Sequence, residues 1–151
     1  MTQSILESLI ASTFRVSTPL IFAALGGMFS ERSGVINIAL EGMMLVGAFF
    51  GAVIAYEMQS PVLGALGAGI AGVSIALLYG LCVIKLKADQ IVAGTAMNLL
   101  AVGLTPFLSK VLFDSTGNTP SLSLDSRFTF APVVIAWVIV LFVWFWKKYT
   151  L

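Results

Sequence analysis

The chain has 151 residues, of which 59% are hydrophobic and 10% are charged, and its formal net charge is +1. Soluble domains carry roughly 25% charged residues, and a small globule cannot bury an excess of apolar side chains this large. The composition therefore excludes a soluble globule, a disordered chain and a nucleic-acid-binding protein, and it indicates that lipid surrounds most of the polypeptide.

The residues that most often carry metal or nucleophilic chemistry are scarce. The chain contains no histidine, and its one cysteine, Cys82, lies within an apolar run. Zinc clusters, Cys–His pairs and Ser–His–Asp triads are therefore excluded for this chain alone. We expect no metal site, no catalytic residue and no cofactor in this chain, and an intramembrane enzyme is the least favoured function.

Uncharged stretches predict an all-α, polytopic bundle of transmembrane helices that forms one domain over residues 1–151. A hydrocarbon core about 30 Å thick needs roughly 20 helical residues. Five stretches are long enough: 5–29, 34–56, 61–84, 90–109 and 128–146; the last three carry no charge, whereas Glu7 and Arg15 interrupt the first and Glu41 the second. The first carries Arg15, so either this side chain snorkels or the first residues lie along the interface. Pro19 predicts a bend in that helix, and Pro61 a helix start.

The distribution of basic residues predicts the orientation of the chain. With the N-terminus outside and the C-terminus cytoplasmic, five basic residues lie inside: Arg32, Lys85, Lys87, Lys147 and Lys148. The reverse orientation places these five outside, against the bias that cytoplasmic loops show. The sequence therefore predicts a multi-pass protein of the plasma or inner membrane.

Small residues recur at every fourth position of the third expected span. They are Gly64, Ala68, Gly72, Ala76 and Gly80. Helices associate in lipid through close backbone approach, so we interpret this stripe as a helix-packing face. The stripe predicts a tight neighbour and gives no information about a substrate.

Polar residues inside the expected spans are the candidate site. Asn37 and Glu41 are four residues apart, which places them on one face if the segment is helical. Gly34 and Gly42 bracket them, so the segment is either a continuous helix or a re-entrant piece. A carboxylate there lines a translocation path, or it bonds a neighbouring helix and fixes the packing.

Three more polar residues lie near the start of the fourth span: Gln90, Thr95 and Asn98. Gln90 and Asn98 share a helix face about 12 Å long. Interhelical hydrogen bonding explains such residues as well as a translocation path does. The chain lacks the GxxxxGK[ST] motif, so any ATP that drives its work is bound by another polypeptide.

Two sequence blocks resemble the permease subunits of nucleoside and simple-sugar ABC importers. They are TPLIFAALGGMFSERSGVINIALEGMMLVGAF (Thr18–Phe49) and ADQIVAGTAMNLLAVGLTPFL (Ala88–Leu108). GVINIALEG is also similar to a region of the branched-chain amino acid permeases. The resemblance implies a role in the translocation path or its scaffold for Asn37, Glu41 and Asn98.

The resemblance also implies partners. Such permeases are usually paired, receive substrate from an extracytoplasmic binding protein and are driven by two cytoplasmic ATPase subunits. Members of the family are roughly twice as long as this chain, so we expect the N-terminal half of a permease, without its coupling segment. Two other hypotheses remain open: a small oligomeric secondary transporter or channel that uses Glu41, and a structural membrane subunit.

Overall fold

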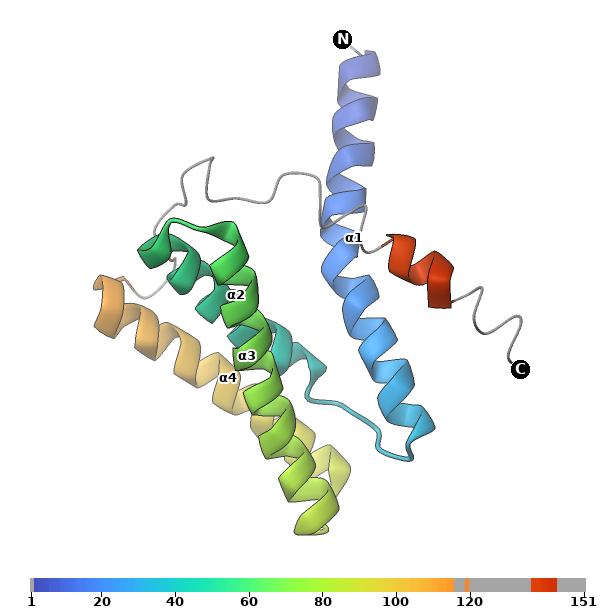
Figure 1. The fold of residues 1–151 in the computed structure, drawn as a ribbon, viewed down its shortest axis with the longest axis vertical. Coiled ribbons are helices and arrows are strands. Elements are labelled where there is room, and N and C mark those ends of the chain that lie inside the picture. The colour runs from blue at the N-terminus through green and yellow to red at the C-terminus, as the bar shows by residue number, and fades with distance from the viewer. Residues whose placement is uncertain (1, 116–118, 120–136, 144–151) are drawn as a thin grey trace. The chain divides into compact units, whose positions relative to one another are not determined.

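The computed structural model describes residues 2–115, 119 and 137–143. The described part is almost entirely helical, and no strand occurs in it. The chain divides into two units, residues 1–29 with 128–151 and residues 30–127 (Figure 1). The fold class expected from the sequence, an all-α bundle of apolar helices, is confirmed, since four of the helices are long and apolar enough to cross a membrane.

The first helix, α1 (Thr2–Arg32), is continuous over 31 residues. Pro19 lies inside it and does not end it. The preceding residue, Thr18, is buried, and its hydroxyl donates to the carbonyl oxygen of Phe14 at 2.8 Å. The Phe14 ring meets the edge of the Trp137 ring at 5.6 Å within the same unit. The fifth expected span, 128–146, lies outside the described residues except for 137–143, which are helical.

Three further helices lie in the second unit: α2 (Leu40–Met58), α3 (Pro61–Gly80) and α4 (Gln90–Phe113) (Figure 1). Pro61 opens α3, as the sequence predicts. At its other end α3 runs directly into a π-helical turn, η1 (Leu81–Lys85). Wider turns of this kind are rare and often mark functional positions.

The turn between η1 and α4 depends on two residues. Lys87 adopts a left-handed conformation with φ of +55°. Asp89 then caps α4, because its carboxylate accepts hydrogen bonds from the amides of Ile91 and Val92 at 2.9 and 3.0 Å. A carboxylate at this position satisfies amides that have no partner within the helix and is favoured by the helix dipole.

Small residues set the contact between α2 and α3. A Cβ atom added to Gly64 would lie 2.6 Å from the Cβ of Ala55 and 2.9 Å from the carbonyl oxygen of Gly51. A Cβ atom added to Gly51 would in turn lie 2.9 Å from the Cβ of Ala68. The two backbones are therefore as close as glycine and alanine allow, which is how helices associate without a hydrophobic driving force.

The predicted stripe only partly coincides with this contact. Gly64 and Ala68 lie at it, whereas Ala76 is exposed and Gly80 has only a side chain of its own helix end nearby. Each four-residue step rotates a helix position about 40° beyond a full turn, so such a row leaves a straight contact after two or three steps. The packed face continues instead through Ile75 and Tyr79.

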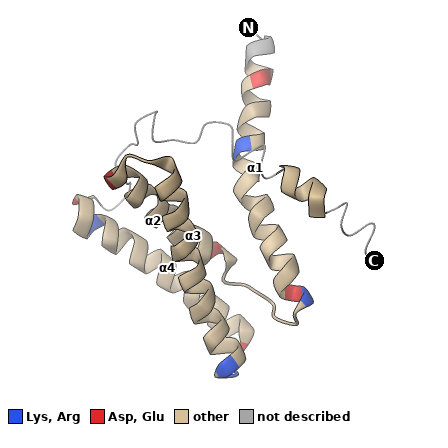
Figure 2. Ribbon diagram, viewed as in Figure 1, with Lys and Arg blue, Asp and Glu red and all other residues tan. Residues whose placement is uncertain are grey.

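Charged residues in the described part lie mostly at helix ends and in the connections (Figure 2). Glu7 and Arg15 on α1 are exceptions, and Glu41 lies at a helix start that is itself placed beside α4, about two turns from the first residue of that helix. Long apolar side chains cover the outside of the helices, for example Ile70 and Leu77 on α3, each 69% exposed. An apolar surface of this kind is compatible with surrounding lipid. Which end of the chain lies outside the membrane stays a prediction.

Candidate functional site

The second expected span, 34–56, becomes helical only at Leu40. Residues 33–39, here called the α1–α2 connection, form turns and a short irregular stretch. Gly34 has φ of +84°, a conformation that glycine adopts without strain. Ser30, in the last turn of α1, donates from its hydroxyl to the carbonyl oxygen of Val35 at 2.7 Å. The expectation of helix from residue 34 is therefore wrong, and of the two open alternatives the continuous helix is excluded.

Gln90 and Tyr79 bind the first half of the connection. The amide of Ile36 donates to the Gln90 side-chain oxygen at 2.8 Å, and the Gln90 side-chain nitrogen donates to the Gly34 carbonyl oxygen at 3.4 Å. The Tyr79 hydroxyl donates to the Ile36 carbonyl oxygen at 2.7 Å. The first residue of α4 and the last turn of α3 thus pair both backbone groups of Ile36.

Asn98 binds the second half. Its side-chain nitrogen donates to the carbonyl oxygen of Ile38 at 3.0 Å, and its oxygen accepts from the amide of Gly42 at 2.8 Å. One amide side chain therefore inserts between the donor and the acceptor of one helical hydrogen bond, that of the Gly42 amide to the Ile38 carbonyl, and pairs both groups. The Asn37 side-chain oxygen accepts from the amide of Ala39 at 3.1 Å, a local turn that also competes with helix.

Two glycines allow α4 to approach this closely. A Cβ atom on Gly94 would lie 2.8 Å from the Cβ of Ile38, and one on Gly42 would lie 2.9 Å from the side-chain oxygen of Asn98. Ala39, fully buried, packs with Tyr79 and with residues of α4 in a small core. Larger residues at either glycine would separate the connection from the groups that pair its backbone.

The connection runs alongside the first two turns of α4. Its upstream end pairs with Gln90, the first residue of α4, and Gly42 pairs with Asn98, about 12 Å further along the helix at 1.5 Å per residue. α2 therefore begins inside the thickness that α4 spans. Irregular backbone is tolerated at such depth only where protein pairs its polar groups or where it lines a water-filled cavity.

Glu41 and Thr95 differ from the three amide residues. Both are exposed. The Thr95 hydroxyl bonds carbonyl oxygens of its own helix, Ile91 and Val92, at 3.0 Å each. Within the described residues the Glu41 carboxylate has no hydrogen-bond or ion-pair partner. Because Asn37 precedes the helix, the shared helix face expected for Asn37 and Glu41 does not exist.

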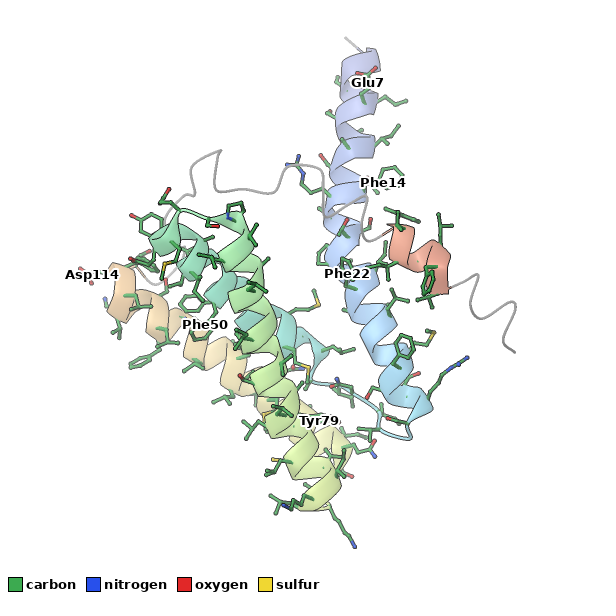
Figure 3. All side chains as sticks on the ribbon, viewed as in Figure 1. Glu7, Phe14, Phe22, Phe50, Tyr79 and Asp114 are labelled. Carbon is green, nitrogen blue, oxygen red and sulfur yellow. The ribbon has the colours of Figure 1, made fainter. Side chains whose placement is uncertain are left out.

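Hydrogen bonding is the chemistry that this site offers. In the part of the chain that the structure describes, no group of three or more His, Cys, Asp or Glu side chains could hold a metal ion. The sequence analysis missed Tyr79, which is 3% exposed and lies in an otherwise apolar stretch (Figure 3). The sequence did contain a clue, because a buried tyrosine in an apolar stretch usually has a hydrogen-bond partner for its hydroxyl.

The fold and this site define a class: a polytopic helical membrane protein in which polar side chains of neighbouring helices hold the irregular connection between two membrane helices. Residues 9–150 match the family described as branched-chain amino acid transport system / permease component. The chain belongs to this family, and it is a multi-pass protein of the cell membrane.

Three relatives illustrate the similarity. The guanosine ABC transporter permease protein NupQ of Bacillus subtilis is 43% identical over 115 residues, which cover 72% of this chain and 36% of NupQ. The nucleoside ABC transporter permease protein NupC of Lactococcus lactis is 38% identical over 114 residues, 72% of this chain and 36% of NupC. TsgC13 of Haloferax volcanii, provisionally named a glucose ABC transporter permease protein, is 41% identical over 105 residues, 69% of this chain and 32% of TsgC13.

The match with each of these relatives spans about a third of that relative's length. The family assignment therefore holds for this chain, whereas the activity of a whole permease is a matter for proposal. No solved structure matches the chain significantly.

Proposed function

We propose that this chain forms part of the membrane-spanning permease subunit of an ABC importer, and that it borders the translocation path for a nucleoside or a simple sugar. Membership of the permease family and the names of the relatives support this function. The observation that carries it is the irregular α1–α2 connection, whose backbone is paired by side chains of α3 and α4, since irregular backbone inside a membrane protein is tolerated where protein pairs it or where it lines a water-filled cavity.

The polar residues divide into two roles in this proposal. Asn37, Gln90 and Asn98 direct their side chains to the backbone of the α1–α2 connection, so they form the scaffold. Glu41 and Thr95 are exposed and face the path. A carboxylate in hydrocarbon is costly, so an unpaired Glu41 at this depth requires water or a polar partner.

The same proposal defines the partners. A second permease subunit completes the path, an extracytoplasmic binding protein delivers the substrate, and cytoplasmic ATPase subunits bind and hydrolyse ATP. The chain itself is not an enzyme and needs no cofactor. Its N-terminus lies outside and its C-terminus lies in the cytoplasm, because the basic residues then gather on the inner side.

Uptake by the assembled transporter that contains this chain tests the proposal. The transporter, with its ATPases and binding protein, is placed in cells that lack their own nucleoside and sugar importers. We expect ATP-dependent uptake of a radiolabelled nucleoside or sugar. Lack of uptake across a panel of both substrate classes would overturn the proposal.

The unpaired carboxylate of Glu41 favours a second candidate, a secondary transporter or channel in which Glu41 binds a proton or a cation. The two candidates differ in their response to a pH gradient. In an ABC importer, uptake depends on ATP and persists when the proton gradient is dissipated. Flux that follows the gradient and is lost in Glu41→Gln would favour the second candidate.

A further inference from the structure

Tyr79 occupies a position that links three parts of the second unit. It lies in the last turn of α3, immediately before Gly80 and η1, and packs in the core with Ala39, Val83, Ala93 and Met97. Its hydroxyl reaches the α1–α2 connection on one side and the start of α4 on the other. Figure 3 shows the ring at the lower end of α3.

The hydroxyl has two acceptors and one proton. The carbonyl oxygen of Ile36 lies at 2.7 Å and that of Gln90 at 3.4 Å. The shorter distance identifies Ile36 as the partner in this structure. The Gln90 carbonyl is a second acceptor close enough to take the proton after a small rotation, so the buried hydroxyl has a partner in either arrangement.

The Ile36 carbonyl depends on this hydrogen bond more than the Tyr79 hydroxyl does, because the hydroxyl has a second acceptor. The carbonyl belongs to the irregular α1–α2 connection beside the first residue of α4, where a carbonyl that loses its partner is costly unless water or another donor reaches it. When the connection separates from Tyr79, the Ile36 carbonyl must meet water or another donor. Movement of the connection toward a hydrated path would provide that water, while the Tyr79 hydroxyl turns to Gln90.

We propose that Tyr79 is a positioning residue for transport, which holds the α1–α2 connection through the Ile36 carbonyl in one arrangement and transfers its hydrogen bond to the Gln90 carbonyl when the connection moves. This inference rests on the proposed function for its role in transport. Its geometric part concerns only residues of the second unit and has a test of its own.

Hydrogen exchange tests the geometric part. Tyr79→Phe keeps the ring in the core and removes the hydroxyl. In the assembled transporter, we expect amides of residues 34–39 to exchange about five-fold faster, as loss of one ordinary hydrogen bond implies. Amides in the α2–α3 contact keep their rates. Tyr56→Phe is the matched control, because the Tyr56 ring meets the edge of the Phe113 ring at 5.8 Å and its hydroxyl makes no hydrogen bond to residues 33–39.

Uptake tests the role in transport. In the proposed importer a separate binding protein captures the substrate, so Tyr79→Phe lowers the maximal uptake rate per transporter, by about five-fold, and leaves the half-saturating substrate concentration unchanged. Tyr56→Phe changes neither quantity. A variant that is merely unstable would lower the amount of assembled transporter and raise exchange in every helix.

The outcomes separate the two proposals. Unchanged exchange in residues 34–39 overturns the inference, as does a rise spread evenly over α2, α3 and α4. A local rise with unaltered uptake overturns the role in transport. Absence of uptake by the unsubstituted transporter overturns the proposed function, and the exchange measurement then still decides whether Tyr79 holds the connection.

Discussion

The α2–α3 contact and the α1–α2 connection lie in the same unit and are held together in opposite ways. At the contact, Gly51, Ala55 and Gly64 bring two regular backbones together without polar side chains. At the connection, Asn98, Gln90 and Tyr79 hydrogen-bond a backbone that has left the helix. The first arrangement depends on shape and fixes two helices in place. The second depends on a few exchangeable hydrogen bonds, which suits a segment that must move.

The largest loss of stability that this comparison predicts follows substitution of Asn98. Asn98→Leu removes the donor to the Ile38 carbonyl and the acceptor of the Gly42 amide at once. We expect a loss of about 3 kcal/mol in the free energy of unfolding, since each unpaired buried group costs about 1–3 kcal/mol. Equilibrium unfolding in mixed detergent micelles measures it. Leu99→Ala, at the exposed neighbour, is the control; an equal loss there would refute the special role of Asn98.

Substitution of Gly64 tests the α2–α3 contact. Gly64→Ala places a methyl group 2.6 Å from the Cβ of Ala55, so the two helices must separate. We expect destabilisation of about 2 kcal/mol, within the range for overpacked interiors. Gly69→Ala on the same helix is the control, because no heavy atom lies within 4 Å of the added group. Equal melting temperatures for the two variants would contradict the close α2–α3 contact.

Gln90 has a smaller predicted effect, because one of its two hydrogen bonds is long. Gln90→Leu removes the 2.8 Å acceptor of the Ile36 amide and the 3.4 Å donor to Gly34. We expect a loss of about 1 kcal/mol, that of one ordinary hydrogen bond. Gln90→Glu retains an acceptor for Ile36 and is expected to lose less. The same unfolding assay compares the two, and a larger loss in Gln90→Glu would show that the Ile36 bond is unimportant.

Thr95 is expected to have the smallest effect of all. Its exposed hydroxyl bonds only carbonyl oxygens of its own helix, which already have helical partners. Thr95→Val should therefore change the free energy of unfolding by less than about 0.5 kcal/mol, as is usual for surface positions. A loss comparable to that of Asn98→Leu would mean that Thr95 contacts a group outside the second unit.

The sequence predicted the regular parts of this structure well. The uncharged stretches predicted membrane helices, and Pro61 predicted the start of α3. The boundary after Asp89 predicted the start of α4 at Gln90. These features are local, because a proline or a charge acts at its own position. The fourth helix continues to Phe113, four residues beyond the expected end, since Lys110 lies in its last turn rather than after it.

The late start of α2, at Leu40 and not at residue 34, was not predictable in the same way. VINIAL has the composition of a membrane helix, and the groups that compete with helical hydrogen bonds are Asn98 and Gln90, more than 50 residues away along the chain. The sequence marks these two residues as polar and does not identify the backbone groups that they bind. Tyr79 was not among the predicted site residues, because a tyrosine in an apolar stretch is first interpreted as a packing residue. Its partner, the Ile36 carbonyl, is 43 residues away along the chain.

The central claim is that the end of the α1–α2 connection and the start of α2 border a hydrated translocation path. Thiol accessibility tests it most directly, in the assembled transporter with Cys82→Ala as background. Glu41→Cys should react with a water-soluble, membrane-impermeant thiol reagent, and transported substrate should slow the reaction, whereas Leu77→Cys on the exposed apolar side of α3 should stay unreactive. A Glu41→Cys variant as unreactive as Leu77→Cys would place this position in lipid or in dry protein and would contradict the account.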